Sequence, residues 1–201
     1  ADADHIPELI GRMQGKDPVA RLHIINILSR FNTPDVQRAL QGQLKDPSKQ
    51  VRAATLSALQ KMDGPIDVAQ ICEMLRDPEL EVQNKAIDVV IKANDPETIK
   101  HLIPILQDEN EYARRAAVEV LNEVGNADSI KSLLAAIADA DWWVRSRAAD
   151  ALGKIGGPKV VDAVLHLIRD DDQDIRRAAI EILNQTKDER AVSHLIEATK
   201  D

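Results

Sequence analysis

Aliphatic residues recur along the chain at intervals of 31 residues. The first column of such positions comprises Leu9, Leu40, Ile71, Leu102, Leu133, Val164 and Leu195. The second column comprises Met13, Leu44, Leu75, Leu106, Ile137 and Ile168. The third comprises Leu28, Leu59, Val90, Leu121, Leu152 and Leu183. Three columns that stay in register without a gap indicate an internal repeat.

Within each repeat the apolar spacing is helical. Leu40 and Leu44 are four residues apart, which places both on one face of a helix. In the second half of a later repeat, Val144, Ala148 and Leu152 follow the same spacing. Each repeat therefore predicts helix A, a short turn and helix B. A lone pair of this length cannot bury its apolar faces, so neighbouring pairs must stack.

These patterns predict an all-α fold, a right-handed α-solenoid of about six two-helix repeats with a 31-residue period and a terminal helix. We expect one domain over 1–201, with repeats at about 3–32, 33–63, 64–94, 95–125, 126–156 and 157–187, and a partial repeat at 188–201. Because Val192, Leu195 and Ile196 do not give the last helix an obvious polar outer face, we expect the chain to be part of a longer protein. The alternative is that this helix serves as a makeshift cap.

Polar residues recur in the same register. An aspartate column lies between the two helices, at Asp46, Asp77, Asp108, Asp139 and Asp170. Asp accepts hydrogen bonds from free N–H groups and Pro suits the first helical position, so we expect each Asp to cap helix B of its repeat, as at Asp46-Pro47. Gly64, Gly125 and Gly156 suit the ends of helices.

An arginine column follows, at Arg21, Arg52, Arg114, Arg145 and Arg176. It could bind anions, or it could join neighbouring repeats by bonding an Asp or a helix C-terminus. The planar guanidinium suits the second role. We favour that role because the column recurs in almost every repeat.

The segment 144–156 reads VRSRAADALGKIG. It resembles the V-R-x-x-A-A-x-A-L-G-x-I-G helix of HEAT-like repeats, in the short form named after phycobilisome lyases. Weaker copies begin at Val51, Ala113 and Ile175, and Gln83 departs from the pattern where the family prefers Arg. The resemblance covers nearly the whole chain and implies an armadillo-like helical fold. It says little about function.

Composition narrows the functional classes. A net charge of −8 argues against a protein that binds nucleic acid through a Lys/Arg excess. No apolar stretch approaches the roughly 18 residues that a membrane helix needs. The single Cys72 cannot form an internal disulfide, and its column predicts a buried structural thiol. Together these features favour the cytoplasm.

No catalytic constellation is visible in the sequence. The five histidines lack metal-ligand spacing, and the His-Glu pairs of HEAT-like di-iron hydroxylases do not occur. No phosphate loop or nucleophile elbow is present. We therefore expect no enzyme activity, no metal and no cofactor.

Helix B carries the positions that vary most between repeats. Trp142 and Trp143 are adjacent and point about 100° apart, so both cannot face the core. Tyr112 lies one repeat before Trp143, where it could stand beside that ring. With Arg115 and Arg147 nearby, these residues have the composition of a protein-binding hot spot. The alternative is that one Trp fills a gap between repeats and the other is an isolated surface residue.

The sequence therefore predicts a non-catalytic scaffold. Its concave helix-B face would bind a protein, a peptide or a neighbouring domain of the same parent chain. The name of the resembled family suggests an alternative, a bilin-lyase-like or chaperone-type accessory protein. A nucleic-acid-binding HEAT-like module is a third reading, which the acidic charge disfavours.

Overall fold

The computed structural model of the protein describes residues 3–64 and 66–198, and within these ranges the regular elements are all helices. The chain divides into two compact units, residues 1–98 and 99–201. Both are built from successive helix pairs, so the predicted all-α solenoid arrangement is confirmed.

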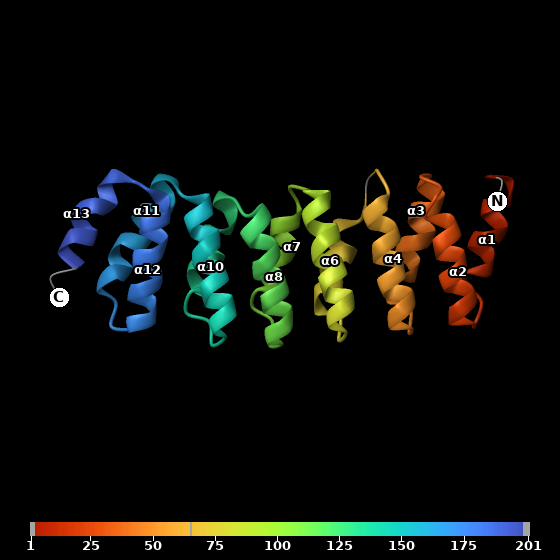
Figure 1. Cartoon of the computed structure of the whole chain (residues 1–201), viewed down its shortest axis with the longest axis horizontal. Helices are drawn as coiled ribbons and strands as arrows, with labels where there is room; N and C mark the ends of the chain where they lie inside the picture. Colours follow the sequence, from red (N-terminus) through yellow and green to blue (C-terminus); the bar gives the residue numbers. More distant parts are fainter. Residues whose placement is uncertain (1–2, 65, 199–201) are drawn as a thin grey trace. The chain divides into compact units, whose positions relative to one another are not determined.

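Unit 1 contains three helix pairs. Its helices are α1 (Ile6–Arg12), α2 (Pro18–Leu28), α3 (Pro34–Gln41), α4 (Lys49–Lys61), α5 (Val68–Glu73) and α6 (Leu80–Ala93). Each helix A packs on the helix B that follows it, and α4 packs between α2 and α6 (Figure 1). The three B helices thus form one layer of this unit.

Unit 2 repeats this arrangement and adds a last helix. Its helices are α7 (Thr98–Ile105), α8 (Glu111–Val124), α9 (Ile130–Ala136), α10 (Trp142–Ile155), α11 (Gly157–Val164), α12 (Gln173–Thr186) and α13 (Glu189–Ala198). Helix α10 packs between α8 and α12, so this unit also has a layer of B helices (Figure 1).

The three apolar columns form the cores of the two units. Leu40, Ile71, Leu102 and Leu133 have no exposed surface, whereas Leu9 near the N-terminal end is half-buried. The third column is at most 2% exposed throughout. Stacking of neighbouring helix pairs within each unit buries these residues.

The aspartate column does not cap helix B, and that prediction was wrong. Asp139 accepts a hydrogen bond from the backbone N–H of Asp141, two residues later, and Asp141 is the residue that caps α10. In the same way Asp108 and Asp170 bond the N–H groups of Asn110 and Asp172, which cap α8 and α12. The turn uses two further residues before the helix begins.

The proline prediction needs the same correction. Pro47 precedes α4 by two residues and does not occupy its first position. Pro does occupy the start of other helices, at Pro18 in α2 and Pro34 in α3. At these positions the missing N–H costs no intrahelical hydrogen bond.

The arginine column joins neighbouring repeats, as predicted, at three steps. Its side chains reach the aspartate of the next repeat in the pairs Arg21–Asp46, Arg52–Asp77 and Arg114–Asp139, with Nε–Oδ2 distances of 2.7, 2.7 and 2.9 Å. A second nitrogen bonds the other carboxylate oxygen in each pair. The planar fork of Arg matches this two-point contact.

One later member of the column, Arg145, departs from this pattern: it lies 3.9 Å from Asp174 rather than forming an ion pair with Asp170 in the described structure. Like the other members, Arg145 and Arg176 donate to backbone carbonyls of the turn before their own helix. The aspartate one repeat beyond Asp170 is Asp201, which lies outside the described residues. We call the three Arg–Asp pairs the arginine ladder.

Glycine allows close packing between α10 and α12. A Cβ atom added at Gly153 would lie 2.0 Å from Oε1 and 2.8 Å from Cβ of Gln185. The Gln185 side chain is held there by a hydrogen bond from its Nε2 to Asp150, at 3.3 Å. The absence of a side chain at Gly153 makes room for that arrangement.

Candidate partner-binding surface

The five residues predicted as a binding site come from two adjacent B helices of unit 2. Tyr112 and Arg115 lie on α8, and Trp142, Trp143 and Arg147 lie on α10. These helices pack against one another, so the 31-residue period brings the five residues into one neighbourhood. We call them the aromatic cluster.

The two tryptophans differ in exposure, as their adjacency on a helix requires. Trp142 is 62% exposed and Trp143 is half-buried. Their ring centroids are 5.5 Å apart with the planes at 87°, an edge-to-face contact. Trp143 thus supports a ring that projects into solvent.

Tyr112 is 44% exposed. The expected contact between Tyr112 and Trp143 is not found among the described residues, where the ring contact joins Trp142 and Trp143. Tyr112 and Trp143 each contact an arginine of their own helix instead. The Arg115 guanidinium lies 5.5 Å from the Tyr112 ring centroid, and that of Arg147 lies 4.9 Å from Trp143. Both distances are within the range of cation–π attraction.

Arg115 also connects α8 to the start of α10. Its Nε and Nη2 donate to the two carboxylate oxygens of Asp141 at 3.0 and 2.5 Å. Asp141 in turn accepts from the backbone N–H groups of Trp143 and Val144. The hydrogen bond from Arg115 is the main reason that the pKa of Asp141 lies below its usual value.

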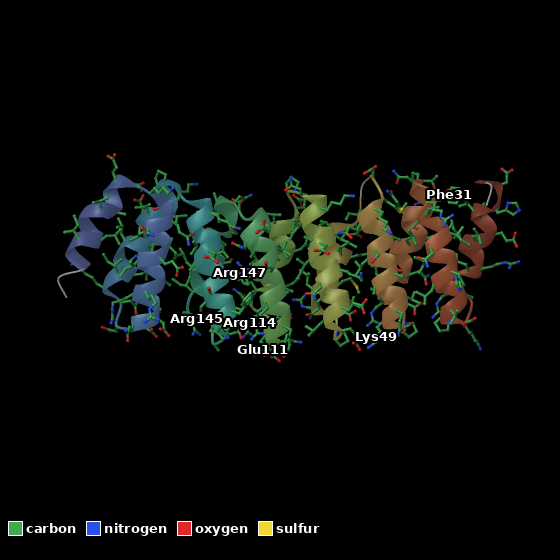
Figure 2. The ribbon with its side chains drawn as sticks, viewed as in Figure 1. Phe31, Lys49, Glu111, Arg114, Arg145 and Arg147 are labelled. Atoms are coloured by element: carbon green, nitrogen blue, oxygen red, sulfur yellow. The ribbon has the colours of Figure 1, made fainter. Side chains whose placement is uncertain are left out.

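Arg147 is likewise committed within the unit. Its Nε lies 3.0 Å from Oε2 of Glu119 on α8, and its Nη1 lies 3.5 Å from Oδ2 of Asp150 on α10. Figure 2 shows Arg147 part-way along α10, while Glu111, Arg114 and Arg145 lie near the ends of their helices that adjoin the turns. The two predicted arginines therefore contact the aromatic rings and also pair with carboxylates of the same unit.

A groove beside the cluster was not part of the predicted site. It runs between α10 and α12. Its lining residues are Trp142, Arg145, Asp174, Arg177, Glu181, Ile137, Ser146, Ala149 and Ala178. Its volume is about 210 Å³. The sequence offered one indication of this groove, the charged positions of helix B that vary between repeats. It does not show which of these positions face Trp142.

The groups that suggested chemistry are structural or dispersed. Cys72 is fully buried, which confirms the prediction, and burial raises the pKa of its thiol to about 12. In the described residues no group of three His, Cys, Asp or Glu side chains could hold a metal ion. None of the helices described here is both long and apolar enough to cross a membrane.

Comparison with protein families identifies the repeat. The family model for HEAT repeats matches three overlapping segments, at 6–90, 68–152 and 130–201. The chain belongs to the HEAT-repeat family. No match was found among curated protein sequences.

Solved structures share the fold of this HEAT-repeat protein. An engineered protein is 19% identical with a TM-score of 0.51, over 90% of this chain and 96% of that chain. Human deoxyhypusine hydroxylase, in complex with glycerol, is 21% identical with a TM-score of 0.51, over 92% and 75%. A designed armadillo repeat protein in complex with the peptide (KR)4 is 16% identical with a TM-score of 0.53, over 90% and 99%. At these identities the likeness concerns the fold alone.

Proposed function

We propose that this HEAT-repeat protein is a non-catalytic scaffold that binds a protein or peptide partner on the aromatic cluster of unit 2. The observation that carries the proposal is the exposure of Trp142, at 62%, beside a second aromatic ring that supports it. An exposed Trp costs solvation free energy, and Trp, Tyr and Arg are the residue types enriched at the energetic centres of interfaces.

The rigidity of the cluster supports the same proposal. Tyr112 and Trp143 each contact an arginine that is itself paired with a carboxylate. Arg115 donates two hydrogen bonds to Asp141, and Arg147 lies at ion-pair distance, 3.0 Å, from Glu119. Side chains that are ordered before binding lose less conformational entropy when a partner arrives. The likeness to a designed armadillo repeat protein solved with a peptide is consistent with a peptide as the partner.

We also propose that the chain belongs to the short subtype of HEAT repeat named after phycobilisome lyases, on the basis of the VRSRAADALGKIG segment. A lyase-like accessory role remains the second candidate, and it rests on that resemblance. Incubation with a tetrapyrrole and an apo-phycobiliprotein would test it directly, because bilin attachment changes the absorption spectrum.

The first experiment compares the wild type with a Tyr112→Ala, Trp142→Ala, Trp143→Ala triple variant as affinity baits in a lysate of the source cells. The proposal expects a protein that the wild type captures and the variant does not. Circular dichroism must show that the variant keeps its helices, since Trp143 is half-buried. Equal capture by both folded baits would place the binding site elsewhere.

A second variant separates binding from folding. Trp142→Ala removes the most exposed ring of the aromatic cluster and leaves Trp143 and Arg147 in place. We therefore expect it to change the free energy of unfolding by less than about 1 kcal/mol. The amount of partner protein captured from the lysate should still fall. Asp128→Asn is the matched control, because Asp128 is exposed on the helix-A side of the same unit.

A further inference from the structure

Two cations of the helix-B layer in unit 2 have carboxylate partners within the unit. Arg147 lies 3.0 Å from Glu119, and Lys154 lies 2.9 Å from Glu123. In each pair the cation belongs to α10 and the carboxylate belongs to α8, one repeat earlier. Unit 2 therefore supplies its own counter-ions for these two positions.

Unit 1 keeps the two cations and lacks both carboxylates. Two repeats earlier in the same register, Lys85 and Lys92 of α6 occupy the positions of the two unit 2 cations. Ser57 and Lys61 of α4 occupy the positions of the two glutamates. Where unit 2 has two negative charges, unit 1 thus has a neutral hydroxyl and one more positive charge.

The backbone contact of one pair is nevertheless retained in unit 1. Lys154 Nζ donates to the carbonyl oxygen of Asn122 at 3.1 Å, in addition to its bond with Glu123. Lys92 Nζ likewise donates to the carbonyl oxygen of Gln60, which is the equivalent of Asn122. The next residue is Lys61 instead of a glutamate. The Lys92 ammonium therefore has the backbone part of this arrangement without the carboxylate part.

A groove over α4, bordered by α2 and α6, contains two of these lysines. Lys61 and Lys85 both line this α4 groove, whose volume is about 310 Å³. Most of the α4 residues that line it are small, at Ala53, Ala54, Ser57 and Ala58. Lys61 is exposed, Lys85 is half-buried, and neither forms an ion pair among the described residues. Glu81 is the carboxylate that lines the groove, so ammonium groups outnumber carboxylates there by two to one.

The whole helix-B layer of unit 1 has the same sign. Its cations are Arg21, Lys49, Arg52, Lys61, Lys85 and Lys92, and its carboxylates are Glu81 and Asp88. Three of these cations are paired with carboxylates of the turns, in Arg21–Asp46, Arg52–Asp77 and Lys49–Glu79. The other three lysines still outnumber the two carboxylates of the layer. This surface is therefore positive although the chain as a whole carries a net charge of −8.

We infer that the α4 groove binds an acidic segment of a protein partner, and that carboxylates of this segment take the places that Glu119 and Glu123 hold in unit 2. The inference goes beyond the proposed function, because it concerns unit 1 and does not involve the aromatic cluster. Charge complementarity of this kind selects the partner and opposes a cationic segment.

The spacing of the two template positions fits such a segment. Glu119 and Glu123 are one helical turn apart, which separates their Cβ atoms by about 6 Å. Alternate residues of an extended segment point the same way and are about 7 Å apart. One carboxylate can then meet Lys85 while the next meets Lys61 and Lys92. The small side chains of α4 leave room for the backbone of the segment.

A nucleic acid is the rival occupant. Its phosphates form a continuous row of negative charge, which the exposed Glu81 and Asp88 of α6 oppose. A peptide can place its carboxylates at the lysines and neutral residues at these two positions. The observations therefore favour the peptide, and the oligonucleotide is included as a probe in the test.

Fluorescence anisotropy with the full chain measures the binding. The probe is a fluorescein-labelled peptide of about 12 residues in which Glu alternates with Ala and Ser, and its matched probe carries Gln in place of every Glu. We expect saturable binding of the Glu peptide and at least about tenfold weaker binding of the Gln peptide. The affinity for the Glu peptide should be lower at about 0.5 M salt than at about 0.05 M.

Single substitutions locate the site. Lys61→Gln and Lys85→Gln should each weaken binding of the Glu peptide about fivefold. Lys45→Gln changes the net charge equally at an exposed position that does not line the groove, and it should leave the affinity within about twofold. Equal weakening by Lys45→Gln would reduce the effect to overall charge and overturn the inference.

A double variant copies the arrangement of unit 2. Ser57→Glu combined with Lys61→Glu supplies internal carboxylates at both positions, so it should weaken binding of the Glu peptide by more than about tenfold. The equivalent positions of unit 2 carry Glu, so we expect the urea midpoint of unfolding to stay at or above that of the wild type. Undiminished binding by this variant would contradict the inference.

Two other results would overturn it as well. The first is tighter binding of a labelled single-stranded DNA of about 12 nucleotides than of the Glu peptide, which would assign the lysines to phosphates. The second is a lack of saturable binding of the Glu peptide up to about 1 mM. Neither result bears on the capture experiment with the aromatic triple variant, so the two proposals can fail independently.

Discussion

The guanidinium of Arg115 binds the carboxylate of Asp141 across two helices, with 3.0 Å between Nε and Oδ1. The same carboxylate caps α10 through the N–H groups of Trp143 and Val144. One side chain thus orders the start of the helix that carries both tryptophans. The binding surface and the packing of the unit depend on the same contact.

Replacement of Asp141 by Ala should destabilise unit 2. The change removes the helix cap and leaves Arg115 without its partner, and we expect a loss of about 2–3 kcal/mol in the free energy of unfolding. Urea unfolding followed by far-UV circular dichroism measures it. Asp128→Ala, at an exposed position of the same unit, is the control and should cost less than about 0.5 kcal/mol.

The Asp141 contact should also depend on pH. Because Arg115 holds the pKa of Asp141 below its usual range, the carboxylate stabilises the fold above the unfolded-state pKa of about 3.9. That stability is lost as the pH falls further, through the folded-state pKa. The difference in stability between the wild type and Asp141→Asn should be constant from about pH 7 to pH 5 and shrink below about pH 4. A difference that persists unchanged at acidic pH would contradict this account.

The arginine ladder should contribute more than surface ion pairs. Arg52 and Asp77 are 12% and 5% exposed at their side chains, so Arg52→Ala strands a buried carboxylate and should cost about 3 kcal/mol. Arg12→Ala removes an ion pair with Glu8 whose side chains are 70% and 58% exposed, and should cost less than about 1 kcal/mol. Comparable effects of the two substitutions in denaturant titrations would show that the ladder is not a major source of stability.

Gly153→Ala should destabilise unit 2 although Ala is the better helix former. The new Cβ would overlap the side chain of Gln185, and we expect overpacking to outweigh the helix-propensity gain of about 1 kcal/mol. Gln185→Ala in the same chain should restore part of the lost stability, because it removes Oε1 and leaves the Cβ atom 2.8 Å from the new methyl group. A double-mutant cycle measures this coupling. If Gly153→Ala alone raises the midpoint of unfolding, Gln185 moves aside freely.

Cys72 should be nearly inert in the folded protein. Burial raises its pKa to about 12, so at pH 8 the reactive thiolate is rare and the reagent has no access to it. Ellman's reagent should react fast in denaturant and slowly without it. The slow reaction of the native protein then measures how often unit 1 opens. Arg52→Ala should increase the rate of that reaction. A fast reaction with the native protein would mean that the α5 core is open to solvent.

The sequence was sufficient for the repeat, the helix pairs and the buried columns. Helical spacing decides which side chains share a face, and the 31-residue register decides which faces meet. It also predicted that the arginine column bonds an Asp or a helix C-terminus of a neighbouring repeat, and at Arg21, Arg52 and Arg114 the partner is the Asp. Similarly, the adjacency of Trp142 and Trp143 required that one of them be exposed.

Tertiary structure alone decided how individual side chains are used. The aspartate column and the true caps are two residues apart, and only the turn geometry shows that Asp139 organises the turn while Asp141 caps α10. The sequence placed Arg115 and Arg147 near the aromatic rings, but it did not reveal that carboxylates neutralise both. Nor did it indicate that Glu181 lines the groove beside Trp142. Periodicity determines which backbone positions are neighbours, whereas the pairing of long charged side chains depends on rotamers and on every acceptor within reach.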